Sequence, residues 1–147
     1  MTRSATARVG REPCASPGFL LWNAALAWQR SVTAALRPYG LTPVQFLILA
    51  CVVAFEDEGV RPNQLMICAR ARTGVTMTSQ VLSKLVDAGL VSRAPNPEDA
   101  RANVVRVSPY GHQLVDATGD VVAEVDREFF ADQCSEVFAL RAFLPQS

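Results

Sequence analysis

Apolar residues recur every three to four positions through most of this chain, which is the period of an α-helix. The pattern predicts a long helix over residues 18–37, a second over 43–55, and shorter ones over 62–69 and 75–88. Another long helix begins at Pro109, and residues 134–144 add a short final one. Residues 1–17 have no such period, and we expect them to form a disordered arm.

Helix start and stop signals agree with these ranges. Thr42 stands before Pro43 and Gln45, which predicts a capping box with proline at the first helical position. Ser108 and Pro109 repeat the pair of cap and proline. Gly89 follows the helix over 75–88, where glycine commonly ends a helix.

In two short runs, 90–93 and 103–107, apolar and polar residues alternate, which predicts a pair of strands. The loop between them, 94–102, contains two prolines and is expected to be exposed. A short helix, a turn, a helix and a hairpin in this order are what a winged helix-turn-helix requires. We therefore predict a mainly α fold with a small two-stranded β-wing, in which 18–147 form one domain and 62–107 its DNA-binding lobe.

The helix over 75–88 would be the recognition helix, since it follows the turn and precedes the hairpin. Its polar side chains offer hydroxyl, amide and ammonium groups to base edges or phosphates. The alternative is a polar helix face that is merely solvated. The candidate DNA-binding residues are Thr76, Thr78, Ser79, Gln80, Ser83 and Lys84.

The chain has no net charge, because its basic and acidic segments offset each other. Its 14 basic residues balance 14 acidic ones, so it lacks the overall positive charge of many nucleic-acid-binding proteins. Residues 70–106 are nevertheless basic, whereas 107–147 are acidic. A basic middle segment is compatible with phosphate contact.

Several segments resemble the MarR family of bacterial winged helix-turn-helix transcriptional regulators. The similar segments are residues 41–46 (LTPVQF), the passage 85–93 from recognition helix to wing, and 97–102 (PEDARA). The resemblance implies that Asp99 braces the wing by pairing with a nearby arginine and that Arg101 enters the minor groove or grips phosphate. The alternative for Asp99 and Arg101 is an ordinary surface ion pair. The chain departs from the family pattern at Thr78, Gln80 and Ala100.

The resemblance also implies a homodimer that binds a pseudo-palindromic operator in double-stranded DNA. In this family the first and last helices of two subunits pack together, here 18–37 and 109–147. Their apolar stripes are suitable for that contact. Packing within one subunit is the alternative for each stripe.

Relatives are often repressors that a small aromatic ligand releases from DNA. Trp22, Trp28, Arg30 and Phe46 are candidates to line such a pocket, although aromatic residues at helical spacing usually belong to the core. Other relatives sense oxidants through cysteine. Cys68 precedes two arginines and is the candidate here, with an inert buried thiol as the alternative.

Other functional classes have little support. The single histidine, His112, has no nucleophile at a recognisable spacing, and we expect no catalytic activity, metal or cofactor. The scattered cysteines and the lack of a secretory signal predict a cytoplasmic protein, and no apolar run is long enough to span a membrane. The competing function is a winged-helix protein-interaction module without DNA binding, which the neutral charge and the absence of arginine at positions 80 and 100 favour.

Overall fold

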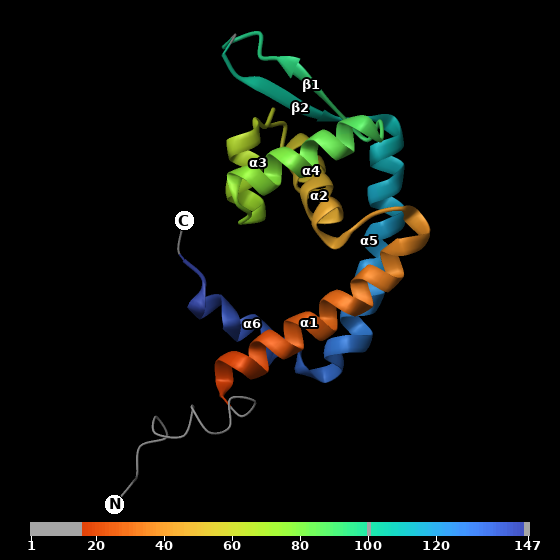
Figure 1. Ribbon diagram of the computed structural model, residues 1–147, viewed down its shortest axis with the longest axis vertical. Coiled ribbons are helices and arrows are strands. Elements are labelled where there is room, and N and C mark those ends of the chain that lie inside the picture. The colour runs from red at the N-terminus through yellow and green to blue at the C-terminus, as the bar shows by residue number, and fades with distance from the viewer. Residues whose placement is uncertain (1–15, 100, 146–147) are drawn as a thin grey trace, which may run out of the picture.

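The computed structural model describes residues 16–99 and 101–145, and Figure 1 shows a mostly helical chain with one hairpin. This confirms the predicted fold class. Most of the expected arm, residues 1–15, lies outside the described residues. The elements are α1 (Pro17–Leu36), η3 (Arg37–Tyr39), α2 (Pro43–Asp57), α3 (Gln64–Ala71), α4 (Val75–Asp87), β1 (Val91–Pro95), β2 (Asn103–Val107), α5 (Pro109–Phe130), η4 (Ala131–Gln133), α6 (Cys134–Ala139) and η5 (Leu140–Phe143).

The predicted caps form in the structure. The Thr42 hydroxyl accepts the Gln45 N–H at 3.2 Å, and the Gln45 side chain accepts the Thr42 N–H at 2.9 Å, which completes the capping box of α2. The Ser108 hydroxyl accepts the Gly111 N–H at 3.0 Å and so caps α5. Each cap satisfies an amide that the helix itself leaves without a partner.

Helix α3 begins at Gln64, two residues after the predicted start at Pro62. The preceding residues are extended and lie against β2: the Val105 N–H donates to the Pro62 carbonyl oxygen at 2.9 Å, and Asn63 forms an antiparallel bridge with Val104. Pairing with the wing therefore overrides the tendency of proline to start a helix. The contact is an isolated bridge beside the two-stranded hairpin.

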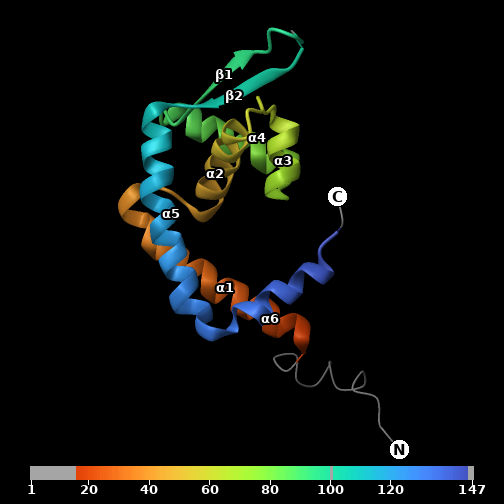
Figure 2. The ribbon, with the colours of Figure 1, turned by 180° about the vertical axis from the view of Figure 1, so that it is seen from behind.

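The molecule has two parts, joined by α5. Helices α2, α3 and α4 and the hairpin form a lobe at one end, while α1 packs beside α5 and leads away from the lobe toward α6 (Figures 1 and 2). The core lies mostly in the lobe, where close packing of apolar side chains supplies the main stabilising term. Its fully buried side chains include Leu36, Ile48, Leu49, Val52, Ile67, Leu82 and Leu85.

The hairpin is antiparallel, with Val91 opposite Val107 and Pro95 opposite Asn103. Its tip is closed by the Asn96 N–H, which donates to the Ala102 carbonyl oxygen at 2.9 Å. Val91 and Val105 are buried against the helices, so the base of the hairpin is part of the core. The tip extends beyond the lobe as a wing (Figure 1).

Within the described residues no single helix has both the length and the apolar character to cross a membrane. Residues Pro17–Tyr39 and Pro43–Asp57 together have the length and composition of a possible membrane span, but the chain bends by 74° between them. In the structure Ile48, Leu49 and Val52 of α2 are buried in the lobe.

Candidate nucleic-acid interface

Helix α4 presents a polar face on the outside of the lobe. Thr76, Gln80, Ser83 and Lys84 are exposed and Ser79 is half-buried, while the opposite side of the helix packs in the core. The turn before it is sharp, because Arg72 adopts a left-handed backbone conformation with φ 53°. This geometry sets α4 across α3, as a helix-turn-helix requires.

Thr78 is an exception to the predicted polar face, because it is fully buried. Its hydroxyl donates to the Gly74 carbonyl oxygen at 2.9 Å and lies 2.7 Å from the Thr73 hydroxyl. The prediction that Thr78 contacts DNA is therefore wrong. A threonine hydroxyl can donate its hydrogen bond to a carbonyl oxygen in the preceding turn of its own helix. The polar side chain of Thr78 therefore did not need to be exposed.

We expect Thr78→Val to lower the free energy of unfolding by about 1–2 kcal/mol, because it removes a hydroxyl from a buried network while keeping the side-chain volume. Thermal and urea denaturation would measure this. Thr76→Val on the exposed face is the matched control and should change stability little. Equal stability of the two variants would contradict the role assigned to the buried hydroxyl.

The wing tip is braced through the backbone. The Asp99 carboxylate accepts the Arg101 N–H at 3.0 Å, and the Asp99 carbonyl oxygen accepts the Ala102 N–H at 3.1 Å. Across residues 16–99 and 101–145, Asp99 forms no ion pair with an arginine. The implied Asp–Arg pair is thus replaced by a turn, which leaves the exposed Arg101 guanidinium available to a ligand outside the chain.

Arg93 is a site residue that the sequence analysis did not single out. Its guanidinium donates to the Ser79 carbonyl oxygen at 3.4 Å and so reaches from β1 to the recognition helix. A cavity of about 270 Å³ separates the start of α3 from the wing, and Arg93 and Arg101 both line it, together with Asn63 and Gln64. Because side chains alternate between the two faces of a strand, the sequence could have predicted the face of β1 that carries Arg93, but not the contact of Arg93 with α4.

The four candidate ligand-pocket residues have different environments. The Trp28 indole N–H donates to the Asp126 carboxylate at 2.7 Å and ties α1 to α5, and Phe46 packs partly buried against the core. Trp22 is 60% exposed and stacks on Phe19, and Arg30 is exposed. None of them lines the cavities at the wing. A shared pocket for these residues stays a prediction.

The two cysteines whose side chains are described are both free thiols. Cys68 is half-buried in the last turn of α3, and its thiol donates to the carbonyl oxygen of Thr73, in the turn before α4, at 2.8 Å. Cys51 is buried, and burial raises the pKa of its thiol above the ordinary value, partly opposed by the positive charge of Arg70. A raised pKa disfavours the reactive thiolate, so Cys51 is a packing residue.

The base of the wing is fixed by one carboxylate. Glu56, at the end of α2, accepts the Val107 N–H at 2.9 Å with one oxygen and lies 2.9 Å from His112 Nε2 with the other. His112 therefore serves as a structural contact between α5 and α2. The described residues contain no group of His, Cys, Asp or Glu side chains that could hold a metal ion.

Comparisons with known proteins agree with this architecture. A family model described as MarR family matches residues 39–102. The uncharacterized HTH-type transcriptional regulator YdcH of Bacillus subtilis is 35% identical over 119 residues, which is 81% of this chain and 81% of that protein.

Two solved structures have the same fold. A mutant MarR from E. coli complexed with operator DNA has a TM-score of 0.79 at 21% identity, over 95% of this chain and 99% of that one. BpsR of Bordetella bronchiseptica, solved to explain how 6-hydroxynicotinic acid regulates its DNA binding, has a TM-score of 0.81 at 19% identity, over 91% of this chain and 96% of that one. Together with the family match and the relative from B. subtilis, the winged helix-turn-helix identifies this chain as a member of the MarR family of transcriptional regulators.

Proposed function

We propose that this protein is a bacterial, cytoplasmic repressor that binds a pseudo-palindromic operator as a homodimer. The observation that carries the proposal is that Arg93 and Arg101 line one cavity between the wing and the start of α3, and that Arg93 also reaches Ser79 on α4. In this arrangement α4 enters the major groove while the wing follows the neighbouring backbone. A protein of the same fold is complexed with operator DNA, which supports the proposal.

Exposed apolar side chains support the homodimer. They gather on α1, at the end of α5 and on the segment after it, which runs from the far end of α5 back toward the lobe (Figures 1 and 2). A second copy that covers them would also hold two recognition helices at a fixed spacing, as a palindromic site requires. The side chains are Phe19, Leu20, Leu21, Trp22, Leu26, Phe129, Phe138, Phe143 and Leu144.

We propose further that a small aromatic ligand releases the repressor from DNA. The pocket would be lined by Trp22, Trp28 and Arg30 of α1 and by Phe46 of α2, two helices that meet at a bend of 74°. Trp28 and Phe46 are only partly buried, so each keeps ring surface available. The DNA binding of BpsR, which shares this fold, is regulated by 6-hydroxynicotinic acid.

Selection from a pool of random duplex DNA, at two salt concentrations and followed by sequencing, tests the proposed function. We expect enrichment of an inverted repeat with half-sites about one helical turn apart, and binding that weakens steeply with salt as counterions are released. Absence of both enrichment and salt dependence would contradict DNA binding and favour a protein-interaction module.

The wing and the recognition helix should contribute in different ways. We expect Arg101→Ala to weaken binding to all duplexes by about tenfold and to reduce the salt slope by about one, because it removes a phosphate or groove contact. Gln80→Ala should instead change the preference among operator sequences. Fluorescence anisotropy with the selected operator and its variants measures both.

Arg37→Ala removes one exposed charge from η3, away from the wing, and serves as the control. It should leave both affinity and preference unchanged. Unaltered DNA binding by both the Arg101 and the Gln80 variants would refute the assignment of the wing and the recognition helix.

A further inference from the structure

Two arginines, Arg61 and Arg106, lie at the edge of the wing that faces the segment before α3. An isolated antiparallel bridge joins Asn63 to Val104 there, and Arg61 and Arg106 both line the same surface cavities beside it. Both side chains are exposed, and neither forms a hydrogen bond or an ion pair with any residue in 16–99 or 101–145. Two like charges at one cavity repel each other, and a bound anion would reduce that repulsion.

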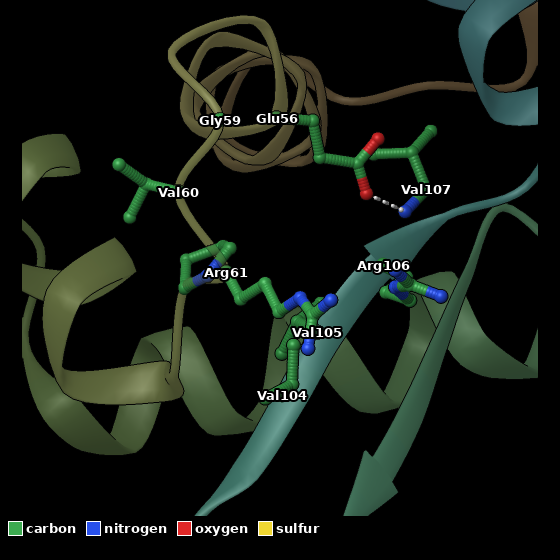
Figure 3. Close-up of a pocket in the computed structure, with 9 residues that line it drawn as sticks. Glu56, Gly59, Val60, Arg61, Val104, Val105, Arg106 and Val107 are labelled. Carbon is green, nitrogen blue, oxygen red and sulfur yellow. Dashed lines mark hydrogen bonds between the residues drawn. The ribbon is translucent and has the colours of Figure 1, made fainter. Parts of the chain in front are cut away.

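These arginines border a hollow with both polar and apolar side chains in its walls. A cavity of about 360 Å³ lies between the end of α2, the segment 60–63 and β2, and Figure 3 shows the Arg61 side chain reaching over β2 beside Val105. A smaller hollow of about 170 Å³ adjoins it toward the wing tip and also has Arg61 and Arg106 in its wall. Together they have the size of a small-molecule site. The apolar residues in their walls are Val60, Pro62, Ala94, Pro95, Pro97, Val104, Val105 and Val107.

The single carboxylate in the hollow is already occupied. Glu56 accepts the Val107 N–H with one oxygen and contacts His112 with the other, as the dashed line to Val107 in Figure 3 shows in part. Both oxygens of Glu56 therefore have partners other than arginine. Neither Arg61 nor Arg106 forms an ion pair within the described part of the chain, and their two positive charges exceed the single carboxylate charge in the walls of the hollow.

The face of the wing that carries Arg106 is not the face that meets the recognition helix, α4. Arg93 pairs with Val105 and reaches α4, and successive residues of a strand point to opposite faces. Arg106 therefore points away from α4. DNA held between α4 and the wing tip would leave the hollow open to a second ligand.

We propose that the hollow binds a small organic anion, an oxyanion carried on a compact apolar group. The two guanidinium groups would bind the oxyanion, since planar guanidinium suits carboxylate and phosphate alike. The valines and prolines would cover the apolar part. Bound there, the anion ties segment 60–63 to β2 and so stiffens the base of the wing.

Amide chemical shifts of the full chain, titrated without DNA, test this site. The probes are phenyl phosphate and benzoate, which separate phosphate from carboxylate sources, and benzyl alcohol is the neutral control. We expect saturable shifts at Val60, Val104 and Val107 with one or both anions and none with the alcohol. Because no DNA is present, the result is independent of the proposed operator binding.

Three single-charge variants complete the experiment. Arg61→Gln and Arg106→Gln should each weaken binding of the anion at least about tenfold, the loss of one charge-assisted contact. Arg37→Gln, the matched control, should bind as the wild type does. The proposal is overturned if no probe gives saturable shifts, if the shifts centre on Trp28 and Phe46, if the alcohol binds equally, or if all three variants bind alike.

Discussion

Gly111→Ala is expected to destabilise the protein by about 3 kcal/mol, because this glycine lies where α5 crosses the base of the wing. A Cβ atom at Gly111 would collide with the Leu90 carbonyl oxygen and lie 2.7 Å from Val107 Cγ1. The Leu90 oxygen cannot easily retreat, since it accepts the Ser108 N–H at 2.9 Å. Relief would require α5 to move away from the wing, so operator affinity should fall together with stability.

Gly119→Ala in the same helix is the control for that prediction. Nothing lies within 4 Å of a Cβ built there, and alanine is the better helix former. We expect this variant to gain about 0.5–1 kcal/mol. Urea denaturation followed by circular dichroism measures both variants, and a Gly111→Ala protein as stable as Gly119→Ala would refute the close approach of α5 to the wing.

The sequence was sufficient for the order and type of the elements, because local signals act over a few residues. The capping box at Thr42 and Gln45 and the cap at Ser108 form as predicted. The start of α3 was misplaced because a tertiary contact, the pairing of Pro62 with Val105, determines it. Helix boundaries that depend on a distant strand are not visible in local spacing.

The candidate site was predictable in outline and not in its contacts. The polar face of α4 could be read from residue types, but Thr78 satisfies its hydroxyl inside the lobe. The turn at Asp99 uses a backbone amide where the family resemblance implied an arginine. Glu56 and Arg93 contact segments far apart in the chain, and Arg61 and Arg106 line the same cavities from two such segments. No spacing rule brings such residues together.

The double substitution Leu20→Glu with Trp22→Glu is expected to abolish the proposed homodimer and to weaken operator binding at least about a hundredfold. These side chains are 56% and 60% exposed on α1, and a buried interface would have to desolvate two new carboxylates. A monomer contacts one half-site and loses the phosphate contacts of the other, so its affinity approaches the non-specific level. Analytical ultracentrifugation and fluorescence anisotropy measure the two effects.

Thr33→Glu with Ala34→Glu adds the same charge to exposed positions of the same helix, outside the apolar cluster on α1. This control separates the loss of the interface from the general effect of negative charge on DNA binding, which is long-ranged at low salt. We expect it to remain dimeric and to keep operator affinity within about threefold. A Leu20 and Trp22 variant that stays dimeric, or that binds the operator as a monomer with wild-type affinity, would separate DNA recognition from dimerisation. The recognition helix and wing of a single lobe would then be sufficient for specific binding.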